Sequence, residues 1–92
     1  MARTVSDIST LAERAQWTVR NGQATYEPVS GGWRGRVTRL REPIGSGRYH
    51  VGIIDRTGVT RYASEASTLN DAARSAERGV AARNALRLVR LA

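Results

Sequence analysis

Arginine is the residue type with the clearest chemical potential in this chain. All fifteen of its Lys and Arg positions are arginine, and seven of these lie between Gly31 and Tyr62. Only two acids, Glu42 and Asp55, fall in that segment, so seven minus two gives it +5 of the net charge of +7. A guanidinium offers a planar fork of donors that matches phosphate, guanine or carboxylate. The absence of lysine is also typical of a GC-rich genome, but the clustering predicts contact with a polyanion.

Side chains alternate between the two faces of a strand, which sorts these residues by position. We expect an antiparallel sheet with one apolar face under a helix and one open face. The apolar face is expected to hold Val37, Val51, Ile53 and Tyr62. Arginines gathered on the open face would repel one another until an anion lies over them. The predicted nucleic-acid or partner-binding residues, including neighbouring arginines of the same segment, are Arg34, Arg36, Arg39, Arg48, His50, Arg56 and Arg61.

The sequence offers few residues for a metal site, a phosphate-binding loop or a catalytic site. There is no Cys and one His, so His50 has no partner ligands of these types for a metal site. We interpret it as a surface residue or a hydrogen-bonded neighbour of Tyr49. The segment Gly45-Ser46-Gly47-Arg48 lacks the lysine of a phosphate-binding loop and does not open a helix. No catalytic constellation is present, and we predict a protein without enzymatic activity, metal or cofactor.

The elements that position these residues follow from periodicity and turn signals. Apolar residues at helical spacing predict a helix over 4–16. Strands are expected at 33–41, 48–55 and 59–63, with a flexible loop at 43–47 and a tight turn at 55–58. Short connections between these strands require an antiparallel meander. Trp33, after the Gly31-Gly32 turn, is expected in the core, and the alternative is stacking on a base.

Residues 17–26 allow two readings. Asn21-Gly22 could end a helix that continues to Arg20, or it could form the two-residue turn of a β-hairpin. The hairpin register places Trp17 opposite Tyr26 as an aromatic cross-strand pair. This pairing favours the hairpin, although the sequence leaves both alternatives open.

The final helix is expected to begin near Thr68. Its apolar stripe changes phase after Gly79, which indicates either a break there or a helix that outruns the sheet and meets another partner. The apolar tail could be a swapped element, a subunit interface or a last turn against the first helix. As a dimer interface it would use Leu86, Leu88, Val89 and Leu91.

Two families share features with this pattern. The first resemblance covers about Trp33 to Val80 and rests on Gly32-Trp33-Arg34-Gly35-Arg36-Val37, on the strand–turn–strand–helix order, and on Thr68-Leu69-Asn70-Asp71-Ala72-Ala73. Together these are similar to the arm-type DNA-binding domain of tyrosine-family phage integrases. The resemblance implies that the open sheet face enters the major groove and that its contacts include Arg34, Arg36, Arg48 and Arg61. The chain departs from that family because 92 residues leave no room for a recombinase catalytic domain.

The α-β-β-β-α order also resembles the double-stranded-RNA-binding domain. In this likeness the last helix would correspond to Ala81-Ala82-Arg83-Asn84-Ala85-Leu86. That family begins its last helix with a basic KKxAK-type segment, whereas this helix begins with Leu69-Asn70-Asp71, which carries an acid. The departure argues against this second family.

We therefore expect one α+β domain over 1–92, with an N-terminal helix, a meander of three to five strands and a C-terminal helix on one sheet face. The predicted function is docking of the arginine-rich face on duplex DNA or structured RNA, with DNA favoured. The alternative is a small phage-encoded inhibitor or accessory factor, such as an anti-CRISPR, that binds a host nucleoprotein complex through an acidic partner surface. The sequence shows no leader and no apolar span, so we expect a cytoplasmic bacterial or phage protein.

Overall fold

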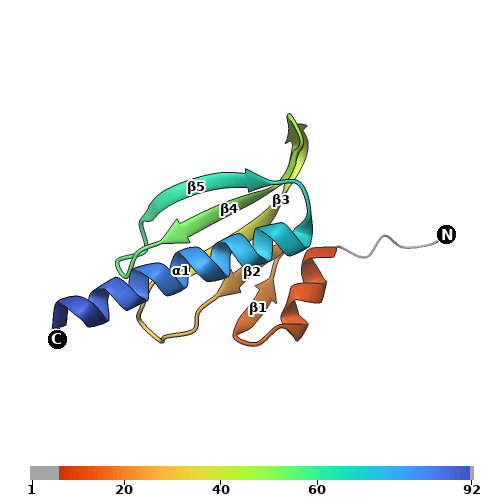
Figure 1. The fold of residues 1–92 in the computed structure, drawn as a ribbon. Helices are drawn as coiled ribbons and strands as arrows, with labels where there is room; N and C mark the ends of the chain where they lie inside the picture. Colours follow the sequence, from red (N-terminus) through yellow and green to blue (C-terminus); the bar gives the residue numbers. More distant parts are fainter. Residues whose placement is uncertain (1–6, 92) are drawn as a thin grey trace.

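The computed structural model describes the backbone of residues 7–91 and the side chains of residues 7–85. It has an α+β fold in which a five-stranded antiparallel sheet, ordered β1-β2-β3-β4-β5, is followed by a C-terminal helix (Figure 1). The predicted fold class is thereby confirmed in its main features. The elements in chain order are η1 (Asp7–Glu13), β1 (Trp17–Arg20), β2 (Gln23–Tyr26), β3 (Arg34–Ile44), β4 (Gly47–Ile54), β5 (Thr60–Ala66) and α1 (Leu69–Leu91).

The N-terminal helix prediction is wrong for the described residues, because η1 is a short 3-10 segment. Its two buried side chains, Ile8 and Leu11, are three residues apart, which matches three residues per 3-10 turn. Ala12 and Ala15, which the helical stripe included, are exposed. Gln16 then adopts a positive φ of 68° and turns the chain into β1. Residues 4–6 of the predicted helix lie outside the described residues.

The ambiguity at residues 17–26 is resolved in favour of the hairpin. Asn21 and Gly22 have φ of 53° and 75°, as a type I′ turn requires at both central positions. The register pairs Trp17 with Tyr26, and their ring centroids lie 5.4 Å apart. Residues 17–20 are paired as a strand with residues 23–26, which excludes a helix continuing to Arg20.

Two strands of the central meander, β3 and β5, extend further than the sequence predicts. β3 continues through Pro43 to Ile44, which pairs with Gly47, so the expected loop shrinks to a tip of two residues. The register is irregular between Arg39 and Ile44, where Pro43 need not donate to a ladder. The β3–β4 hairpin consequently projects beyond the other strands (Figure 1).

The C-terminal helix α1 is continuous through Gly79, so of the two expected alternatives the break does not occur. A Cβ at Gly79 would lie 2.9 Å from Ile53 Cδ1, so the helix passes close to this strand side chain at the glycine. Past Val80 the described helical side chains are half-buried or exposed. Figure 1 shows the end of α1 running beyond the strands. The side chains proposed for a dimer interface, Leu86, Leu88, Val89 and Leu91, lie outside the described residues.

The core lies where α1 contacts the strands β3 and β4. Buried side chains from the sheet and from η1 meet small residues of α1. The buried set is Ile8, Leu11, Trp17, Ala24, Val37, Tyr49, Val51, Ile53, Ala72, Ala73, Ala76 and Val80. No helix in the described part of the chain combines the length and apolar character needed to cross a membrane.

The N-terminal segment is tied to α1 by one carboxylate. Glu77 accepts hydrogen bonds from Arg14 Nε at 3.0 Å, from Arg14 Nη2 at 2.7 Å and from Trp17 Nε1 at 2.7 Å. The bonds from Arg14, assisted by the bond from Trp17, lower the pKa of Glu77, although partial burial opposes ionisation. The charge-assisted fork therefore positions η1 and β1 against the helix.

Candidate functional site

Four of the predicted binding residues share one side of the β3–β4 pair. The register pairs Arg36 with Gly52 and Thr38 with His50, while Val37 faces Val51. Opposite residues in an antiparallel pair share a face, and neighbours along each strand alternate. The side away from Val37 and Val51 therefore carries four residues that we call the arginine face: Arg34, Arg36, Arg48 and His50.

The arginine face continues onto the first hairpin. Thr25 pairs with Arg36 and Gln23 with Thr38, and Gln23 in turn pairs with Arg20. Arg20 therefore lies on the same side of the sheet and was missed by sequence reasoning. The signal that could have found it is the hairpin register itself, because it fixes which residues of β1 face the same way as those of β3.

The guanidiniums of the arginine face are not neutralised by acids in the described structure. Within residues 7–85, Arg34, Arg36 and Arg48 form no ion pair with an acidic side chain. The Nε atom of Arg34 is buried without a hydrogen-bond partner there. Glu65 pairs with His50 in the β4–β5 register and brings one acid to this side. Arg48 is exposed and Arg36 is half-buried, and an unpaired guanidinium at the surface remains available to an external acceptor.

Space between these side chains is kept by small residues. Gly52 of β4 pairs with Arg36 of the neighbouring strand β3 and with Ala63 of the other neighbour, β5. A Cβ at Gly52 would make only ordinary contacts, 3.6 Å to Thr60 and 3.7 Å to His50. The position next to Arg36 thus holds no side chain, and Gly52 itself is buried beneath its neighbours.

Arg39 is engaged elsewhere, contrary to its inclusion in the predicted set. It lies on the Val37 side of β3, opposite Tyr49, and its Nη1 forms an ion pair with Asp7 Oδ2 at 3.1 Å. The Tyr49 hydroxyl donates to the same carboxylate. Partial burial acts to raise the pKa of Asp7. The hydrogen bond from Tyr49 and the charge of Arg39 outweigh this effect, so the pKa of Asp7 is lowered. Arg39 therefore helps to fasten η1 to the sheet.

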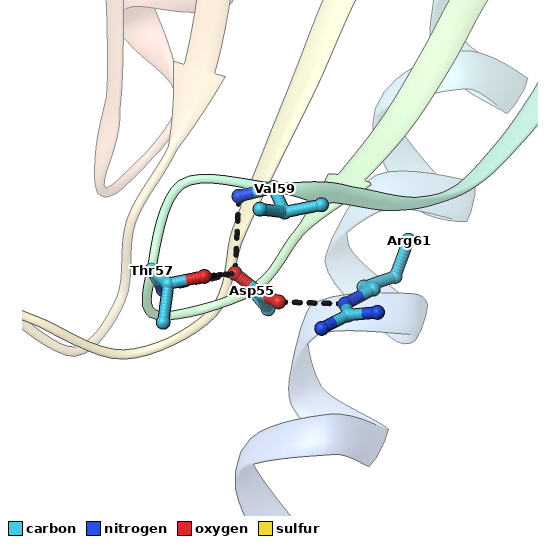
Figure 2. Close-up of polar contacts among 4 residues, drawn as sticks. All are labelled: Asp55, Thr57, Val59 and Arg61. Carbon is cyan, nitrogen blue, oxygen red and sulfur yellow. Dashed lines mark hydrogen bonds and ion pairs between the residues drawn. The ribbon is translucent and has the colours of Figure 1, made fainter.

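Arg61 is also held internally, at the β4–β5 turn. The pairing of Ile53 with Tyr62 and of Ile54 with Thr60 leaves Arg61 as an extra residue, so simple alternation fails there. Its Nε donates to Asp55 Oδ2 at 2.7 Å (Figure 2). This ion pair corrects the expectation that Arg61 joins the other arginines on one uncovered face. Arg56 is exposed on the turn itself.

Asp55 organises this turn through its second oxygen. Oδ1 accepts bonds from Thr57 N at 2.9 Å, Thr57 Oγ1 at 2.6 Å and Val59 N at 3.0 Å (Figure 2). The Thr57 and Arg61 hydrogen bonds hold the pKa of Asp55 well below its ordinary value, although desolvation opposes this. The predicted turn at 55–58 is confirmed, with Gly58 N bonded to Asp55 O at 3.0 Å and a φ of 93° at Gly58.

The described residues contain no group of three or more His, Cys, Asp or Glu side chains arranged to hold a metal ion. Comparisons of the chain with protein-family models, with curated proteins and with solved structures find no match. The site is accordingly interpreted from its own geometry and charge.

Proposed function

We propose that the protein binds duplex nucleic acid, with DNA favoured, by docking the arginine face on it. The observation that carries the proposal is the row of Arg34, Arg36 and Arg48 on adjacent antiparallel strands without acidic partners among residues 7–85. Alternate residues of one strand are about 7 Å apart and neighbouring strands about 5 Å apart. Such a grid presents several donor forks to one polyanionic surface at once.

The fold supports this docking geometry. We infer that α1 covers one face of the sheet only, since Gly35 and Ile53 approach Ala76 and Gly79 on the Val37 side. On the opposite face the exposed Arg48 and the half-buried Arg34 and Arg36 would then meet a ligand. A two-stranded β-ribbon fits the major groove of B-DNA, where Arg can donate to guanine edges or to phosphates. The major groove of A-form RNA is too deep and narrow for such reading, which favours DNA.

The order β3-β4-β5-α1 is also the order implied by the resemblance to the arm-type domain of phage integrases. Under that likeness Arg34, Arg36 and Arg48 keep their proposed contacts. Arg61 does not contribute in the same way, because Asp55 restrains it. Arg20 takes a place at the margin of the surface through its pairing with Gln23.

The proposal is tested by fluorescence anisotropy with a labelled blunt DNA duplex at low salt. The double variant Arg36→Ala/Arg48→Ala removes two guanidiniums from the arginine face and should weaken binding by at least about tenfold, since each phosphate contact contributes through counterion release. The control Arg74→Ala/Arg78→Ala makes the same charge change at exposed positions of α1. The affinity of this control variant for the duplex should stay within about twofold of the wild-type value.

Two results would contradict the proposal. One is equal weakening by both double variants, which would indicate net charge rather than a defined face. The other is absence of binding to DNA and RNA duplexes at low salt. That result would favour the accessory-factor alternative, in which the arginines meet acidic side chains of a protein partner.

A further inference from the structure

A second cluster lies at the end of the sheet where β3 begins. Trp33, just before β3, and Tyr62 of β5 have ring centroids 6.5 Å apart with an angle of 27° between the planes. The guanidinium carbon of Arg83, from α1, lies 4.2 Å from the Tyr62 centroid and 5.9 Å from that of Trp33. Three elements thus bring two flat rings and one cation together.

The backbone at this cluster is fixed by α1. Asn84 Oδ1 accepts a hydrogen bond from Trp33 N at 3.2 Å. Gly32 is buried so close to Asn84 that an added Cβ would lie 3.0 Å from the same oxygen. Trp33 is half-buried, whereas Tyr62 remains 48% exposed. The rings are therefore anchored from beneath, while Tyr62 retains surface accessible to a ligand.

Beside these rings is a depression of about 370 Å³. Such a volume lies within the range of small-molecule sites. It is lined by Trp33, Asp55, Arg56, Thr57, Arg61 and Tyr62. One wall is therefore aromatic, and the other belongs to the turn that Asp55 organises.

The turn presents positive charge to the depression. Asp55 is already satisfied by Thr57, Val59 and Arg61, so it is not free to bind a cation. Its bond to Arg61 uses Nε only, as Figure 2 shows, and leaves the Nη donors for another acceptor. Arg56 makes no ion pair within residues 7–85. Two guanidiniums thus line the depression together with the two rings.

We propose that this depression binds one unpaired nucleotide, with its base against Trp33 and Tyr62 and its phosphate at Arg61 and Arg56. Bases of every type can stack on aromatic side chains, and the phosphate complements the charged wall. The proposal rests on the duplex-binding function. The rings lie on the Val37 side of the sheet, because Tyr62 pairs with Ile53, and the turn at 55–58 connects the depression with Arg34 of the arginine face. Arg34 follows Trp33 directly, and its Nη2 lies 3.8 Å from where a Gly58 Cβ would be. A strand leaving a duplex at Arg34 would reach the turn next.

The test compares a blunt DNA duplex with the same duplex carrying a three-nucleotide single-stranded extension. The extended duplex should bind about tenfold more tightly, the size of one base–aromatic stack. Tyr62→Leu should abolish the difference without weakening blunt-duplex binding, and Tyr62→Phe should retain it. Tyr26→Leu is the matched control, because Tyr26 belongs to the other aromatic pair, with Trp17. Circular dichroism verifies that each variant is folded.

A second readout is the intrinsic fluorescence of tryptophan during titration with a short single-stranded oligonucleotide. Trp17 is 4% exposed, so a change in emission is expected from Trp33 and should disappear in Trp33→Phe. An equal response to a poly-glutamate peptide would overturn base stacking. Equal affinity for the two duplexes would overturn the nucleotide site while leaving duplex binding intact. If the wild-type protein does not bind the blunt duplex but still shows the Trp33 response, the proposed function is overturned instead.

Discussion

Gly35 of β3 lies directly against Ala76 of α1. A Cβ at residue 35 would be 2.9 Å from Ala76 Cβ, closer than carbon atoms pack, and 3.5 Å from Ala76 Cα, which is ordinary contact. We expect Gly35→Ala to push α1 from the sheet and to lower the free energy of unfolding by about 1–3 kcal/mol. Urea denaturation measures this loss.

The reason for that loss can be separated from an effect on the strand alone. If the clash with Ala76 is the cause, Ala76→Gly should cost less in the Gly35→Ala background than in the wild type. A glycine in a helix costs about 1 kcal/mol by itself, so the coupling between the two changes is the decisive quantity. Simple additivity of the two changes would contradict this packing account.

Glu77 should make stability depend on pH. Its pKa is lowered in the folded state by the bonds from Arg14 and Trp17, so its contribution is present above the ordinary value of 4.5 and is lost as the pH falls through the folded-state pKa. We expect Glu77→Gln to lower the free energy of unfolding by about 1–2 kcal/mol at pH 7. The difference from wild type should shrink as the pH falls below that ordinary value, and a difference that stays constant would be inconsistent with this role.

Asp55 should restrain Arg61 from binding a duplex. In Asp55→Asn, the amide oxygen can still accept from Thr57 and Val59, but an amide N–H would face Arg61 Nε, and the guanidinium would be released. Affinity for a blunt duplex should rise roughly two- to fivefold. Asp71→Asn makes the same charge change at an exposed position of α1 and should have a smaller effect. Equal gains in both variants would show that only net charge matters.

Much of the fold was predictable because short sequence signals determine the local backbone conformation. Asn21-Gly22 supplies the two positive φ values of a tight hairpin, and the register expected for Trp17 and Tyr26 is the one observed. The phase change after Gly79 left two alternatives for α1, because helical periodicity carries no information about Ile53, which approaches Gly79 from the sheet. Its role depends on a residue of another element, and the sequence pattern of one helix cannot reveal that.

The site was predictable where strands alternate regularly and not elsewhere. Arg34 and Arg36 follow simple alternation, so their shared side could be inferred. Arg61 lies at a register irregularity between Ile53 and Ile54, so simple alternation does not place its side chain. The partner of Arg39, Asp7, is 32 residues away in the chain. Arg83 could have been placed from its spacing of three residues after the buried Val80, since both lie on one stripe of α1.

The salt dependence of duplex binding tests the central claim most directly. The logarithm of the association constant should fall linearly with the logarithm of salt concentration. Removing Arg36 and Arg48 together should reduce the magnitude of that slope by about 2, because each neutralised phosphate adds about 0.9 to it. Removing Arg74 and Arg78 should leave it unchanged. A slope that stays the same in Arg36→Ala/Arg48→Ala, or that falls equally in both double variants, would contradict docking through the arginine face.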